Sequence, residues 1–330
     1  MAATGTESLE SEHLALRSGA GVIDRSDRGR LALSGPGAVE FLNGQVTNEL
    51  DGLAGGEGRY AAFLTHKGKM LGDVRIIAVA APGGGGVELL LDTERLALQS
   101  LFDMIRRFKV GYDVELHKRT LETGELALIG PRAAELAGAE QLEGAPEHAN
   151  VALSLDGLDA LAVRTELGVD LICAAADTGT LLEALRRRGA LAVGESAAEC
   201  LRIERGRPRY GIDLDETVIP QEAGLNERAV SFTKGCYVGQ ETVARLFYKG
   251  RPNRHLRGVL LSATAPAGTE LRLGERVVGQ LTSVADSPAL GPIGLALLRR
   301  EAEVGARIEV GESGRGVVVE LPFATGSTAR

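Results

Sequence analysis

The densest group of reactive side chains is the segment KGCYVGQE, from Lys234 to Glu241, which combines a thiol, a cation, an aromatic ring and a carboxylate with two glycines. Glycine permits backbone conformations that other residues resist, so Cys236 could occupy a tight turn within reach of amide N–H groups and Lys234. Such neighbours lower the pKa of a cysteine and make its thiol reactive. An unpaired cysteine is also commonly a small buried hydrophobe in a structural turn. The segment alone leaves both interpretations open.

Other reactive residue types do not form a recognisable site. The acids Asp213, Asp215, Glu216 and Glu222 lack the Asp-x-Asp-x-Asp-Gly spacing of a calcium loop, so we expect them in a solvated loop. The five histidines include no pair at helical spacing, so no metal site is expected. The run Gly83 to Gly86 lacks the GxxxxGK[ST] pattern of a phosphate loop and is interpreted as a turn.

A basic stretch follows the cysteine segment directly. KGRPNRHLR, Lys249 to Arg257, concentrates cations that could receive an anionic polyglutamate tail or a stretch of RNA. A solvated linker into the next strands is the favoured interpretation.

Hydrophobic spacing predicts the elements that position these residues. Apolar residues three and four apart predict a helix over 98–108, and the apolar runs 74–80 and 87–91 predict a hairpin. The Ser196-x-x-Glu199 capping pattern predicts a helix that carries Arg202 and stops near Gly206. After about residue 250, short apolar runs between glycine turns predict a small barrel or sandwich. The part before it mixes helices and strands, so the fold class is α+β.

Composition limits the class of protein. The 330 residues include 44% hydrophobic and 25% charged residues, as in a folded globular protein, and their net charge of −8 argues against a whole-surface binder of nucleic-acid backbones. Three cysteines cannot all pair, and no apolar run reaches the length of a membrane helix, so we expect a cytoplasmic protein without a membrane partner. The polar residues 1–12 are expected to form a flexible tail.

KGCYVGQE resembles the signature of the YgfZ family, folate-binding proteins associated with iron–sulfur cluster maintenance and related to the glycine-cleavage T-protein, an aminomethyltransferase. The segments HLALRSGAGVIDRSDRGRLALSGPGAVEFLNGQVTNEL and LRIERGRPRYGIDLDETVIPQEAGLN look like the same superfamily, and the tail from about His255 resembles its C-terminal barrel. The resemblance therefore covers nearly the whole chain. It implies a folate-binding α+β core of lobes at 13–250 and a C-terminal β-barrel domain at 251–330.

The resemblance also implies site residues. Asp170, in TELGVDL, aligns with the T-protein carboxylate that contacts the pterin, and Arg202, in CLRIERG, aligns with its folate-contacting arginine. Asp73, in GKMLGDVR, aligns with one carboxylate of an acidic pair near the reaction centre, and Gly72 stands where the other acid belongs. From the residues alone, Asp170 would be the water-facing residue of a strand, Arg202 a surface cation and Asp73 a strand cap.

These features together predict a tetrahydrofolate-binding protein that supports assembly or repair of iron–sulfur clusters, with iron–sulfur enzymes or their assembly factors as partners. Cys236, Lys234 and Asp73 are its expected catalytic residues, and Asp170, Arg202 and Asp73 are expected to bind the folate. Three cysteines are too few for a cluster held by this chain alone, since such clusters usually use four thiolates. The alternative is a folate-dependent one-carbon (aminomethyl) transferase, and the second alternative is a tRNA-associated modification factor.

Overall fold

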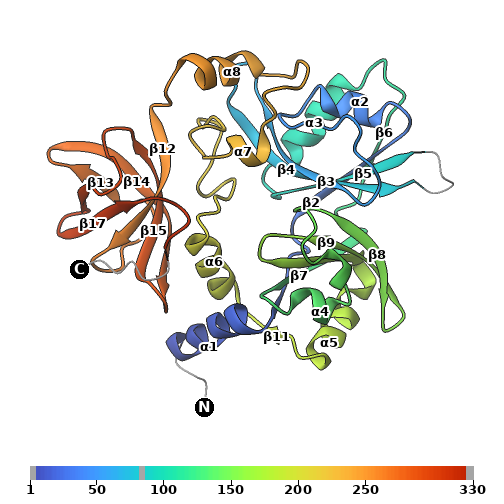
Figure 1. Cartoon of the computed structure of the whole chain (residues 1–330), viewed down its shortest axis with the longest axis horizontal. Coiled ribbons are helices and arrows are strands. Elements are labelled where there is room, and N and C mark those ends of the chain that lie inside the picture. The colour runs from blue at the N-terminus through green and yellow to red at the C-terminus, as the bar shows by residue number, and fades with distance from the viewer. Residues whose placement is uncertain (1–4, 82–85, 325–330) are drawn as a thin grey trace.

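The computed structural model describes residues 5–81 and 86–324. Two sheet-containing lobes lie one above the other, a helix-containing segment runs beside them, and a barrel stands on the opposite side of that segment (Figure 1). The predicted α+β core followed by a small C-terminal barrel is confirmed.

The first lobe is an antiparallel sheet of five strands in the order β3-β4-β5-β2-β6. Its helices α2 and α3 contribute Phe41 and Ile105 to the same buried cluster as Leu31 and Ile76 of the sheet. The predicted hairpin and the helix over 98–108 are confirmed, whereas residues 83–85 of the predicted glycine turn lie outside the described residues. The elements are β2 (Gly29–Ser34), α2 (Ala38–Asn43), β3 (Gly58–Leu64), β4 (Met70–Ala80), β5 (Val87–Thr93), α3 (Leu98–Phe108) and β6 (Glu115–Lys118).

The second lobe is a six-stranded sheet in the order β11-β1-β7-β10-β9-β8. Leu136 of α4 and Leu181 of α5 pack with Leu128 and Leu171 of the sheet in a second buried cluster. The elements are β1 (Gly21–Asp24), β7 (Thr123–Ile129), α4 (Ala133–Ala137), η1 (Glu140–Leu142), β8 (Asn150–Leu155), β9 (Leu158–Arg164), β10 (Gly168–Ala174), η2 (Ala175–Asp177), α5 (Thr178–Arg187) and β11 (Leu191–Ala192). A small apolar cluster of Ile77, Val163 and Ile172 joins the two lobes.

The predicted flexible tail at 1–12 is wrong from Gly5 onward. Helix α1 (Gly5–Ser18) packs against α6 (Glu195–Glu204), and His13 Nε2 lies 2.8 Å from Glu204 Oε1. The segment reads as polar, but its partner lies 191 positions further along the chain, where no local pattern can reveal it.

Helix α6 forms near the predicted position, although without the predicted capping box. Gly194 occupies the N-cap and makes no side-chain cap, while Glu199 accepts hydrogen bonds from Arg202. The segment continues through α7 (Asn226–Ala229) and α8 (Gln240–Lys249).

The barrel closes in the order β12-β15-β14-β13-β16-β17. Its strands are β12 (Arg254–Leu261), β13 (Glu270–Leu273), β14 (Arg276–Ser287), β15 (Gly291–Arg299), β16 (Arg307–Val310) and β17 (Gly314–Val319). None of the helices within 5–81 and 86–324 is long and apolar enough to cross a bilayer.

Candidate functional site

A cavity of about 250 Å³ lies where the two lobes meet α6. Asp73 comes from β4 in the first lobe, Asp170 from β10 in the second, and Arg202 from α6. The structure therefore brings together the three residues that were predicted to bind folate, although they are far apart in the sequence.

Asp73 is buried, and its carboxylate is held by a neighbouring tyrosine. The hydroxyl of Tyr60 on β3 donates to Asp73 Oδ2 at 2.5 Å. Burial raises the pKa of Asp73, and the hydrogen bond from Tyr60 opposes that rise. A carboxyl group with a raised pKa exchanges protons more readily near neutral pH, as general acid–base chemistry requires.

Gly72 has a packing reason to lack the second acid. A Cβ atom at this position would lie 2.5 Å from the ring of Phe63 and 2.7 Å from Cβ of Ala97, which is closer than any real Cβ contact. The first-lobe core thus excludes a side chain here, which leaves Asp73 without an acidic neighbour at position 72.

Asp170 faces a buried charge network rather than water. Arg75 on β4 donates to Asp170 Oδ2, and also to Asp92 at 2.6 Å and Glu125 at 2.8 Å. Burial alone would raise the pKa of Asp92, but Arg28 and Arg75 hold it below its usual range. The network fixes Arg75, so one oxygen of Asp170 is held in place across the boundary between the lobes. Interpreting Asp170 as a water-facing strand residue was wrong.

All five N–H donors of Arg202 have partners. Two bond Glu199, at 2.8 and 2.9 Å, and one bonds the carbonyl oxygen of Arg207 at 2.5 Å. The other two bond Asp213 and the hydroxyl of Ser283 on β14, each at 2.7 Å. Arg202 therefore lines the cavity and also ties α6 to the barrel.

Asp213 is part of this contact between α6 and the barrel and does not lie in the predicted solvated loop. It is 2% exposed and accepts hydrogen bonds from Thr282 at 2.6 Å and Ser283 at 2.7 Å. The prediction of a solvated acid was wrong here because the acid pairs with an arginine and with barrel hydroxyls that lie far away in the sequence.

His148 was not predicted as a site residue, although it lines the cavity beside Tyr60. Its neighbours Glu147 and Arg228 line the cavity too, and Arg228 Nη2 bonds Glu147 at 2.7 Å. His148 and Glu147 lie in the irregular segment before β8, and Arg228 lies in the four-residue helix α7, where hydrophobic periodicity gives no signal.

Lys234 is bonded to backbone carbonyl oxygens of the first lobe. Its buried ammonium donates to the carbonyl oxygens of Asn43, Val46 and Asn48, at 2.7, 3.0 and 2.6 Å. Burial lowers the pKa of Lys234 to about 8. With three carbonyl partners the lysine anchors its loop, and its role as a catalytic residue stays a prediction.

Cys236 is exposed in the loop between α7 and α8. Neither Cys236 nor Lys234 is among the described residues that line the cavity. The expectation that the thiol acts at the folate opening is therefore corrected: thiol and cavity are separate places on the molecule.

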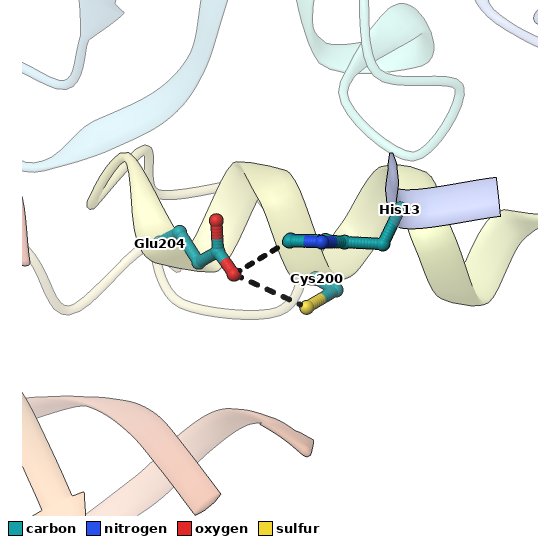
Figure 2. A group of neighbouring side chains, drawn as sticks. All are labelled: His13, Cys200 and Glu204. Carbon is teal, nitrogen blue, oxygen red and sulfur yellow. Dashed lines mark hydrogen bonds and ion pairs between the residues drawn. The ribbon is translucent and has the colours of Figure 1, made fainter. Parts of the chain in front are cut away.

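A second cluster joins α1, α6 and the barrel. Figure 2 shows His13 from α1 beside Cys200 and Glu204 of α6, whose candidate ligand atoms all lie within 4.8 Å of one another. Glu204 Oε1 bonds His13 at 2.8 Å, the thiol of Cys200 at 3.7 Å and the hydroxyl of Ser287. Burial raises the pKa of Cys200, and the negative charge of Glu204 raises it further, to about 12. The thiol is therefore neutral. These groups satisfy one another, which makes the cluster a packing joint.

Comparisons with known proteins agree with this architecture. A family model described as "GCVT N-terminal domain" matches residues 3–234. The chain belongs to this family. An aminomethyltransferase of Streptomyces avermitilis is 30% identical over 338 residues, covering 96% of this chain and 89% of that protein. A chloroplastic protein of Arabidopsis thaliana, provisionally named a transferase (At1g60990), is 29% identical over 330 residues, covering 96% of this chain and 75% of its own.

The GCVT-family fold is also seen in a solved structure. The crystal structure of glycine cleavage system aminomethyltransferase T from Bartonella henselae matches with a TM-score of 0.84, at 24% identity, over 96% of this chain and 90% of that one. The T-protein fold expected from the sequence is thus confirmed. Aminomethyltransferases of this family use tetrahydrofolate as substrate or cofactor. The finer assignment to YgfZ stays a prediction.

Proposed function

We propose that this protein binds tetrahydrofolate in the cavity between the lobes and catalyses folate-dependent one-carbon (aminomethyl) transfer. The observation that carries the proposal is the convergence of Asp73, Asp170 and Tyr60 on one cavity, in a chain of the GCVT family. This convergence favours the aminomethyl transferase, the alternative expected from the sequence, over the iron–sulfur role.

The cavity suits the pterin end of a folate. Its volume of about 250 Å³ is below the roughly 300–1,000 Å³ of pockets that enclose a whole drug-sized ligand, so a bicyclic ring enters and the tail stays outside. The amino and ring N–H groups of a pterin suit the carboxylate of Asp170. Arg207 and Arg209 also line the cavity and are half-buried. Arg207 is paired with Glu166 and Arg209 with Glu94, so they would exchange these partners to bind the carboxylates of a glutamate tail.

Asp73 supplies the proton chemistry in this proposal. Transfer of the one-carbon unit forms two carbon–nitrogen bonds, to N5 and N10 of the folate, and breaks the bonds that join the carbon to its amino group and to its carrier. The two N–H protons of the folate are passed on, one to the amino group, which leaves as ammonia, and one to the carrier atom. Asp73 would exchange the proton that the amino group gains, with Tyr60 holding its carboxylate in place. Arg202 would shape the wall, since a direct contact with folate requires it to release one of its present partners.

Two measurements test the proposal. Tetrahydrofolate at micromolar concentration should raise the melting temperature, because a ligand of the native state stabilises it by mass action. Tetrahydrofolate with an aminomethyl donor should then be converted to methylene-tetrahydrofolate and ammonia, and turnover should survive Cys236→Ala, because the thiol lies outside the cavity. If tetrahydrofolate leaves the melting temperature unchanged, the proposal that the cavity binds it is rejected.

A second candidate function is the iron–sulfur role expected from the YgfZ resemblance. The exposure of Cys236 in the KGCYVGQE segment favours it, since a thiol that meets a protein partner must be accessible. Cys236→Ala would then keep folate affinity and fail to complement a deletion strain, whereas full complementation would exclude the thiol. The tRNA-associated alternative draws less support, because Arg254 of its basic stretch pairs with Glu222 at 2.9 Å.

A further inference from the structure

His148 has two unfavourable features in one residue. It is 3% exposed, and neither ring nitrogen has a hydrogen-bond partner within the described part of the chain. Its φ of 71° lies in the left-handed region, which disfavours side chains with a Cβ atom. Buried polar groups are normally paired, so an unpaired one in a cavity wall indicates a ligand that is not present.

The protonation state of His148 defines what it can bind. Burial lowers the pKa of His148 to about 4, so the ring is neutral at pH 7 with one donor nitrogen and one acceptor nitrogen. Nε2 lies 3.8 Å from the carboxylate oxygen Oε1 of Glu147, which is too far for a hydrogen bond. The nearby negative charge favours the proton on Nε2. Nδ1 is then an unused acceptor.

The surroundings keep this acceptor beside the site of the proposed chemistry. The backbone N–H of His148 donates to the carbonyl oxygen of Arg164 at 2.8 Å, and its ring centroid lies 6.2 Å from that of Tyr60. Gly58 leaves room for the residue, since a Cβ there would lie 2.6 Å from Cβ of His148. The backbone is thus fixed, while the terminal torsion of an imidazole is soft enough to turn Nδ1 toward a ligand.

We propose that His148 selects the reduced form of the pterin, with Nδ1 accepting a hydrogen bond from the ring N8–H. This inference rests on the proposed function, that the cavity takes a folate. Tetrahydrofolate carries N8–H whichever one-carbon group sits on N5 or N10, whereas N8 of fully oxidised folic acid bears a lone pair. Two acceptors would then face each other, and a site built to pair with an N–H rejects a ligand that lacks it.

The test compares dissociation constants for 5-formyl-tetrahydrofolate and folic acid by calorimetry. The wild type should favour the reduced ligand at least about tenfold. His148→Leu should bring the ratio close to one by weakening the reduced ligand, and His66→Leu, at an exposed histidine, should leave the ratio unchanged. A ratio unaffected by His148→Leu would overturn the selection.

A measurement on the unaltered protein covers the case in which the leucine variant fails to fold. In ¹⁵N-labelled wild type, the Nδ1 resonance of His148 should move upfield with 5-formyl-tetrahydrofolate and stay in place with folic acid. An unmoved resonance with bound reduced ligand overturns the inference while the proposed function stands. If the wild type binds neither ligand, the proposed function fails and the inference fails with it.

Discussion

Replacing Asp170 with asparagine tests whether a single carboxylate in the cavity wall carries folate binding. Among the described residues, hydrogen bonds to this side chain engage Oδ2 alone, through Arg75. Asparagine can keep its oxygen toward Arg75, and its NH2 group then replaces the second oxygen of the carboxylate. A ligand N–H would meet a donor instead of an anion.

The magnitudes follow from these contacts. A hydrogen bond to a charged group contributes about 1.5–3 kcal/mol, so the dissociation constant of tetrahydrofolate should rise by roughly 10- to 150-fold. The fold should lose only about 1 kcal/mol, because Arg75 keeps Asp92 at 2.6 Å and Glu125 at 2.8 Å. Calorimetry measures the affinity, thermal unfolding without ligand measures stability, and Asp159→Asn on the exposed side of β9 is the matched control. Unchanged affinity for Asp170→Asn would refute this account of the cavity.

Three further outcomes follow from burial and packing. A thiol reagent should titrate one cysteine rapidly in the native protein, Cys236, and all three after unfolding; two rapid thiols would contradict the burial of the others. Gly72→Asp should lower the free energy of unfolding by about 1–3 kcal/mol in urea, by collision with Phe63, and an unchanged midpoint would contradict that packing. His148 has a pKa of about 4 in the folded protein, against 6.5 for an unperturbed histidine. Between these values the unfolded state binds more protons, so the free energy of unfolding decreases as the pH is lowered from 6.5 to 4. Between pH 6.5 and 4 the wild type should lose about 3 kcal/mol more than His148→Leu, and equal losses would refute the assignment.

The parts of the fold that were predictable have locally encoded patterns. Helix α3 shows its apolar face at three- and four-residue spacing, and the barrel strands alternate with glycine turns, so both could be read from short windows. Helix α1 could not, because its burial depends on Glu204 and the remainder of α6. A polar segment looks like a tail until its distant partner is known.

The site divides in the same way. Asp73, Asp170 and Arg202 could be proposed from their motifs, but their grouping depends on how two lobes and a helix pack. The occupancy of the Arg202 donors depends on Ser283 in the barrel, 81 positions away. His148 belongs to no periodic element, and what marks it is an absence of partners that only coordinates reveal.

Lys234 is buried and Cys236 is exposed, although they are two positions apart. The two candidate functions, folate binding in a cavity and a thiol that meets a protein partner, require these two different environments. Reading a pterin requires a desolvated wall, because polar groups discriminate best where water cannot compensate. A thiol that meets a macromolecule requires exposure. Lys234 connects the two places, since it donates to the carbonyl of Asn48, whose side chain donates to the carbonyl of Tyr60 at 2.9 Å. The lysine thereby ties the cysteine loop to the strand that carries a cavity residue, while the thiol itself is exposed.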